Sequence, residues 1–179
     1  AFLRQRSHGL IALTSREGHG RLRRLQEALG WPVLVQEQET YLLPGVQPLH
    51  SFASRQDLAP GLQMRWTPGP TPGSAVLLAW SEESAPSSAP KGPALLFCGR
   101  LLSPVAEGRA APLRTRRSFH WDRWLHSLEA LRNHWPVREP VALASGAGLG
   151  ALRGAALIPG ALAQLEALDF QALQAMSPP

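Results

Sequence analysis

Residues 67–73 read Thr-Pro-Gly-Pro-Thr-Pro-Gly and are flanked by two apolar runs, at 62–66 and 75–80. Three prolines and two glycines in seven positions are incompatible with a helix or a central strand. Proline lacks a backbone N–H, and glycine loses much conformational freedom when it is fixed. The segment therefore predicts a turn that joins two strands, which restricts the chain to folds built on a sheet.

Short apolar runs and amphipathic segments alternate along the rest of the chain. Runs with the length of buried strands lie at 9–14, 32–35, 94–98 and 141–144. Helices are predicted at 20–29, 119–135 and 160–175, with a short one at 36–43. We expect a loop over 44–61 and an irregular, arginine-rich stretch over 103–117. Strands that alternate with helices are typical of an α/β sandwich.

Two of the predicted helices have a clear apolar face. The helix at 20–29 places Leu22, Leu25 and Leu29 on one face and ends at Gly30. The helix at 119–135 carries a longer apolar stripe, made of Trp121, Leu125, Leu128, Leu131 and Trp135. Trp124 lies beside this stripe, and we expect partial burial for it. Both faces are expected to pack on the sheet.

The composition limits the class of protein. A chain of 179 residues with 44% hydrophobic residues predicts one domain, 1–179, with a flexible polar insert at 81–93 and a tail at 176–179. No apolar run reaches the ~18 residues of a transmembrane helix, so we expect no membrane contact. Cys98 is the only cysteine, which excludes an intrachain disulfide and a cysteine zinc site. A cytoplasmic location is the default expectation.

Basic residues outnumber acidic ones, with a net charge of +5, and 17 of the 18 are arginine because the chain has a single lysine. Arginine suits phosphate and carboxylate contacts. The candidate phosphate contacts are Arg21, Arg24, Arg114, Arg116 and Arg117. The alternative interpretation is a solvated helix face and a basic loop, and it is favoured because no aromatic residues interleave with the arginines.

Four segments together resemble one family. They read W-T-P-G-P-T-P-G-S-A-V-L-L at 66–78, P-A-L-L-F-C-G-R-L-L at 93–102, L-I-A-L-T-S-R-E-G-H-G-R-L-R-R-L at 10–25 and A-S-G-A-G at 144–148. In this order and at these spacings they resemble the metallo-β-lactamase fold superfamily. Its members show T-P-G-H-T-P-G-S before a strand, an apolar strand that ends in G-D, T-H-x-H-x-D-H and P-G-H-G.

The resemblance implies a fold and a chemistry. The implied fold is an αβ/βα sandwich of the metallo-β-lactamase type that lacks the first N-terminal strands, since only 13 residues precede Thr14. The implied chemistry is zinc-dependent hydrolysis. Histidines and carboxylates at strand ends hold one or two Zn²⁺ ions, which lower the pKa of a bound water.

The sequence departs from the family at the metal ligands. The residues that stand at the ligand positions are Ser15, Glu17, His19, Gly20, Pro70, Arg100 and Ala147. Proline and alanine offer no side-chain donor, and arginine keeps its proton. Without a gap, His19 takes the aspartate position and Gly20 that of a histidine; with a one-residue gap, His19 is the one histidine ligand retained. We therefore expect a guanidinium–carboxylate pair of Arg100 and Glu17 in place of the metals.

The glycines of the motifs are retained while the ligands are not. They are Gly69, Gly73, Gly99, Gly146 and Gly148. The leading hypothesis is therefore a pseudoenzyme, a non-catalytic scaffold for binding or assembly that takes no cofactor. Its partner would be an unidentified protein or a second copy of the chain, and nucleic acid is a weaker expectation.

Two alternatives stay open. One is a metal-dependent hydrolase with non-standard zinc ligands, for which Glu17 and His19 are the weak candidates. The other is an RNA- or nucleotide-binding module that uses the arginine clusters. His120, His126 and His134 lack the i, i+4 spacing of a metal pair and are expected on the helix surface. Within the superfamily, 93–150 resembles a short-form branch of cyanobacteria and plastids.

Overall fold

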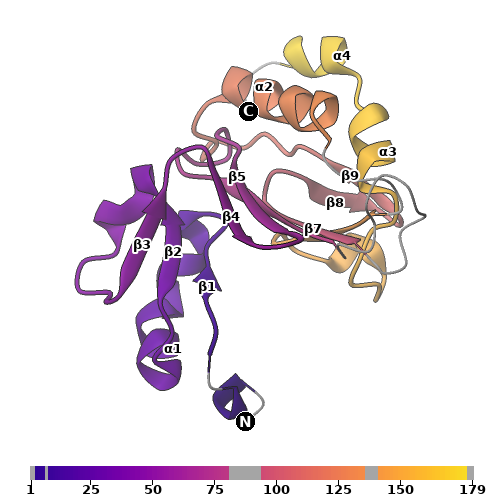
Figure 1. Ribbon diagram of the computed structural model, residues 1–179. Helices are drawn as coiled ribbons and strands as arrows, with labels where there is room; N and C mark the ends of the chain where they lie inside the picture. Colours follow the sequence, from indigo (N-terminus) through magenta and orange to yellow (C-terminus); the bar gives the residue numbers. More distant parts are fainter. Residues whose placement is uncertain (1–2, 7, 81–93, 136–140, 177–179) are drawn as a thin grey trace.

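The computed structural model describes residues 3–6, 8–80, 94–135 and 141–176, so the predicted insert at 81–93 and residues 177–179 lie outside the described residues. Two main sheets form the centre of the molecule, and helices flank them on both sides (Figure 1). No helix in the described ranges combines the length and the apolar character that a bilayer-spanning segment needs.

The smaller sheet is parallel, with the order β1-β2-β3. Its strands are β1 (Ile11–Ala12), β2 (Val33–Gln36) and β3 (Leu49–Phe52). The 3₁₀ helix η2 (Arg16–Arg21) and helix α1 (Leu22–Leu29) connect β1 to β2, and a second 3₁₀ helix, η3 (Glu37–Leu42), follows β2. A short turn, η1 (Leu3–Gln5), precedes the sheet. Gly30 ends α1 with a left-handed φ of 69°, as predicted.

The larger sheet has the order β10-β7-β6-β5-β4. Its strands are β4 (Arg55–Ala59), β5 (Leu62–Trp66), β6 (Ala75–Ala79), β7 (Ala94–Gly99) and β10 (Val141–Ser145). Neighbours are antiparallel except β7 and β10, which run parallel. The prediction that 67–73 joins two strands is confirmed, because β5 and β6 pair directly across it.

Three helices lie on the outer side of the larger sheet (Figure 1). They are α2 (Trp121–Asn133), α3 (Ala161–Glu166) and α4 (Phe170–Gln174). The hairpin of β8 (Ser103–Ala106) and β9 (Arg109–Ala111) and the turn η5 (Gly150–Leu152) complete the elements. The predicted apolar stripe of α2 is confirmed for Trp121, Leu125, Leu128 and Leu131, which are all buried, and Trp124 is also buried.

The alternation of side chains along the strands explains the layers. In β2, Val33 and Val35 pack in one apolar cluster with Leu22 of α1, while Leu34 packs in another with Met64 and other residues of the larger sheet. In β6, Val76 and Leu78 join the cluster under α2. Because successive side chains of a strand point to opposite faces, each sheet packs on helix at one face and on the other sheet at the opposite face. This is the expected αβ/βα sandwich.

Two of the predicted connections contain strands. The loop expected over 44–61 contains β3 and β4, and the irregular stretch expected over 103–117 contains the β8–β9 hairpin. Arg55, Gln56 and Asp57 of β4 have exposed side chains and no apolar alternation. A strand without apolar alternation forms because it pairs with a neighbouring strand through backbone hydrogen bonds, and a local sequence pattern does not predict this pairing.

The predicted helices differ from the structure in two places. The helix expected at 160–175 is two helices, because Asp169 caps α4 through a hydrogen bond from the Ala172 N–H to its Oδ1. On α1, Leu25 is exposed and Gln26 is buried instead. The Gln26 amide donates to the carbonyl oxygens of Trp31 and Pro48, which satisfies this buried polar group.

The strand expected at 9–14 is also shorter than predicted, because β1 is limited to two residues.

Candidate functional site

The loops that carry the four motifs converge at one edge of the sandwich. The Ala75 N–H donates to the Thr14 carbonyl at 2.8 Å, and the Gly146 N–H donates to the Gly99 carbonyl at 2.7 Å. These bonds tie the loop after β1 to β6 and the loop after β10 to β7. Motif segments that are far apart in sequence therefore meet, as the resemblance predicts.

Two of the retained glycines are required by this convergence. Gly69 has a φ of 148°, and a Cβ there would lie 2.3 Å from Cβ of Trp124 on α2. Gly99 has a φ of 54°, and a Cβ there would lie 2.9 Å from Oγ1 of Thr14. Both positions combine a backbone conformation that favours glycine with a close approach of another element. These glycines therefore serve the fold, with or without a metal.

A cavity of about 300 Å³ opens where the loops meet, and it brings together Glu17, Pro70 and Arg100. Its other polar lining comes from the segment between β9 and α2, with Ser103 of β8. The lining side chains there are Thr115, Arg116, Arg117 and Ser118. The cavity thus holds three arginines and one carboxylate.

Arg100 and Glu17 form an ion pair across the cavity. Nη1 of Arg100 donates to Oε2 of Glu17, so the pair expected from the sequence is present. The side chains are 43% and 39% exposed, so water screens their attraction. The guanidinium occupies a position where the family resemblance implies a metal-bridging carboxylate.

The other ligand-equivalent positions offer little to a metal. Pro70 and Ser15 are buried, and Ala147 contributes its backbone N–H to Oγ of Ser145 at 3.1 Å. Gly20 has no side chain. Among the described residues, no three His, Cys, Asp or Glu side chains gather in a way that could hold a metal ion. Zinc and iron sites need imidazole, thiolate or carboxylate donors, so the side chains present at these positions do not fit such a site.

His19 does not line the cavity. It is half-buried, and its Nε2 has no hydrogen-bond partner among the described residues. Burial lowers the pKa of His19 below its usual value; nearby Glu39 acts in the opposite direction and Arg16 in the same one. Glu39 is itself buried, with Oε1 accepting from the Gly73 N–H at 3.0 Å, and Oε2 has no hydrogen-bond partner in the part of the chain that the structure describes. The two candidate zinc ligands, Glu17 and His19, therefore lie in different surroundings, since Glu17 lines the cavity and pairs with Arg100 whereas His19 does neither.

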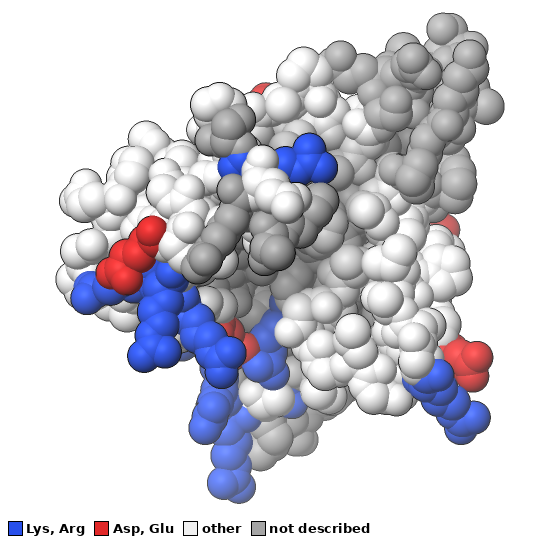
Figure 2. Space-filling model, turned by 90° about the horizontal axis from the view of Figure 1, so that it is seen from below, with Lys and Arg blue, Asp and Glu red and all other residues white. Residues whose placement is uncertain are grey.

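The candidate phosphate contacts separate into two groups. Arg116 and Arg117 are exposed and line the cavity, whereas Arg114 lies 5.3 Å over the Trp121 ring and donates to the Met176 carbonyl. Arg21 and Arg24 are exposed on η2 and α1. Figure 2 shows the molecule from below, the side on which α1 lies in Figure 1, and basic side chains crowd one part of that face with few acidic ones.

The sequence did not point to the hydroxyl groups of the cavity. Oγ of Ser118 accepts from the Thr115 N–H at 2.9 Å, and Ser74 does the same for Thr71 at 2.9 Å. The sequence signal for these hydrogen bonds is the shared spacing T-x-x-S, because a serine hydroxyl can accept from the backbone N–H three residues earlier and close a turn.

Cys98 is a core residue as expected, and burial raises the pKa of its thiol to about 11.

Comparisons with known proteins support the fold. No protein-family model matches the chain, and no curated protein matches it. Among solved structures, it is similar to the B3 metallo-β-lactamase BLEG-1, with 18% identity and a TM-score of 0.56 over 90% of this chain and 75% of that one. It is also similar to TTHA1623, solved in a di-iron-bound form, with 20% identity and a TM-score of 0.53 over 82% and 74%.

A third similar structure is an archaeal metallo-β-lactamase superfamily protein from Sulfolobus tokodaii, with 16% identity and a TM-score of 0.53 over 92% of this chain and 66% of that one. The chain spans about half the length, 49%, of an N-acyl homoserine lactone hydrolase that it matches with a TM-score of 0.42. The three structures with TM-scores above 0.5 show that the chain has the metallo-β-lactamase fold, at an identity that establishes the fold alone.

Proposed function

We propose that this chain is a non-catalytic binding protein in which the Arg100–Glu17 pair takes the place of metal ions and the surrounding cavity takes an anionic group. The observation that carries the proposal is the ion pair itself, which brings a guanidinium into the cavity where the motif loops converge. A guanidinium does not lose its proton in proteins and is a donor only. It would repel a metal ion rather than bind it.

The charge of the cavity supports an anionic ligand. Of its three arginines, Arg100 is paired with Glu17, while Arg116 and Arg117 extend into solvent. Guanidinium groups bind phosphate and carboxylate through two parallel hydrogen bonds. The hydroxyl groups of Thr115 and Ser118 line the same wall of the cavity as Arg116 and Arg117 and can donate further hydrogen bonds. A phosphate-bearing ligand satisfies all of these groups together.

The test measures binding of inorganic pyrophosphate by calorimetry and by the shift in melting temperature. Arg117→Gln is the site variant, and Arg24→Gln is the matched control because Arg24 is exposed on α1. We expect Arg117→Gln to weaken binding about ten-fold and Arg24→Gln to leave it unchanged, as one charge-assisted contact contributes about 1.5–3 kcal/mol. Equal effects of the two variants, or no binding, would contradict the anion site.

The two alternatives make different predictions. A hydrolase with non-standard ligands would need Glu17 released from Arg100, so Arg100→Ala would increase its zinc affinity. An RNA-binding module would use the arginines of η2 and α1. Its affinity would then fall steeply with salt, and Arg24→Gln would have the larger effect. The same variants therefore separate the three functions.

A further inference from the structure

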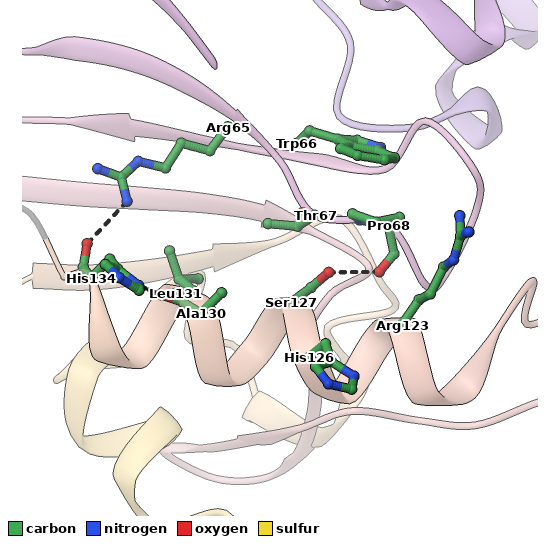
Figure 3. A pocket seen from close by; sticks show the side chains of 10 residues that line it. All are labelled: Arg65, Trp66, Thr67, Pro68, Arg123, His126, Ser127, Ala130, Leu131 and His134. Carbon is green, nitrogen blue, oxygen red and sulfur yellow. Dashed lines mark hydrogen bonds between the residues drawn. The ribbon is translucent and has the colours of Figure 1, made fainter. Parts of the chain in front are cut away.

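A second cleft lies between β5 and helix α2, separate from the Arg100–Glu17 cavity. It measures about 490 Å³ and is bounded by β5, the start of that turn and one face of α2. Figure 3 shows the strand and the turn above and the helix below. The two cavities share no lining residue. Nothing in the motifs of the sequence pointed to this cleft.

Basic side chains stand at both ends of this cleft (Figure 3). Arg65 reaches from β5 to the end of α2, where its Nη1 donates to the His134 carbonyl at 3.0 Å. Arg123 rises from the start of α2 beside Pro68. Burial lowers the pKa of Arg65, which means that an anionic partner would offset an existing desolvation cost. No Asp or Glu is among the described residues that line the cleft.

Two histidines on the same helix add further polar groups. Nδ1 of His126 lies 2.9 Å from the Asp122 carbonyl, and Nδ1 of His134 lies 3.1 Å from the Ala130 carbonyl. A carbonyl oxygen only accepts, so Nδ1 of each ring carries a proton. This leaves Nε2 of each ring as the atom that can meet a ligand.

The walls between the two ends are apolar. Trp66 and Pro68 form the upper wall, and Ala130 and Leu131 form the lower one (Figure 3). Ser127 spans the gap near the Arg123 end, since its hydroxyl donates to the Pro68 carbonyl at 2.7 Å. The indole of Trp66 is held in place by a hydrogen bond from Nε1 to the Pro72 carbonyl at 2.8 Å. A fixed aromatic wall suits a flat ring.

We propose that this cleft is a binding site for a small anion whose phosphate or carboxylate group is joined to a flat apolar ring. The ring lies between Trp66 and α2, and the anionic group meets Arg123 or Arg65. A few convergent polar groups in a mostly apolar pocket of this size are typical of small-molecule sites. The proposal does not depend on the function of the Arg100–Glu17 cavity.

Binding is measured by calorimetry with two probes, AMP and indole-3-acetate, which distinguish a phosphate from a carboxylate. Adenosine and inorganic phosphate serve as half-ligands. The site variants are Arg123→Gln, whose side chain is exposed, and Ala130→Phe, which fills the cleft from the helix. Arg109→Gln on β9 is the matched control, because it removes one positive charge from an exposed side chain that lines neither cavity. Melting temperatures of all variants show that they fold.

We expect at least one probe to bind with a Kd below about 1 mM and each half-ligand at least about ten-fold more weakly, which corresponds to about 1.4 kcal/mol. Arg123→Gln and Ala130→Phe should each raise the Kd about ten-fold, and Arg109→Gln should not change it. The proposal is overturned if neither probe binds, if inorganic phosphate binds as tightly as AMP and indole-3-acetate does not bind, or if Arg109→Gln weakens binding as much as Arg123→Gln.

Discussion

The Arg100–Glu17 pair is best tested by a double-mutant cycle of Arg100→Ala and Glu17→Gln. The side chains are 43% and 39% exposed, so the pair belongs to the partly solvated class whose coupling is about 0.2–1 kcal/mol. We expect a coupling near the upper end, since the pair joins two loops far apart in sequence. In a chain of this size, 1 kcal/mol corresponds to a melting shift of about 2–4 °C.

The assay is urea denaturation followed by tryptophan fluorescence, with the four proteins of the cycle in one buffer at low salt. High salt should reduce the coupling, because ions screen exposed charges. Arg100→Asp is expected to destabilise more than Arg100→Ala, since it places a second carboxylate opposite Glu17. Additivity of the two single variants within about 0.3 kcal/mol would refute the pair, as would Arg100→Ala and Arg100→Asp variants with unchanged stability.

Three further predictions concern the surroundings of the site. Gly69→Ala should destabilise by more than about 2 kcal/mol in the same urea assay, because its Cβ would meet Trp124, whereas Gly148→Ala, which has open space, serves as the control. Burial lowers the pKa of His19, so the unfolded chain binds a proton more readily than the native chain. The contribution of His19 to stability is therefore full above the ordinary histidine pKa of about 6.5 and falls as the pH drops below it. His19→Gln should flatten the dependence of the melting temperature on pH between pH 7 and 5. Cys98, with a pKa of about 11, should resist a thiol reagent at pH 7 until the protein is unfolded, and rapid native labelling would contradict its burial.

The sequence predicted those parts of the fold in which local pattern and tertiary packing agree. The stripe of α2 and the turn after β5 are examples, because periodicity and proline chemistry act within a few residues. Strands β3 and β4 escaped prediction because their stability comes from partners: β3 pairs with β2, and β4 pairs with β5. Gln26 was missed because its hydrogen bonds reach the distant Pro48 carbonyl.

The candidate site was predicted in part for a related reason. The motif resemblance placed Glu17 and Arg100 together, and the structure confirms their contact. The motif resemblance did not predict that His19 lies outside the cavity and near Glu39. This position depends on how η2 and η3 pack. The cleft under α2 was not predicted, since its charged groups come from β5 and α2, which are about 60 residues apart in the sequence.

The most direct test of the central claim is the metal content of the protein purified without chelator, measured by mass spectrometry, followed by zinc titration of the melting temperature. Ligand that binds the native state must raise the melting temperature. If Arg100 and Glu17 take the place of the metals, zinc and iron will be substoichiometric and added zinc will produce no shift. About one or more tightly bound zinc or iron ions per chain, with stabilisation by zinc, would contradict the account.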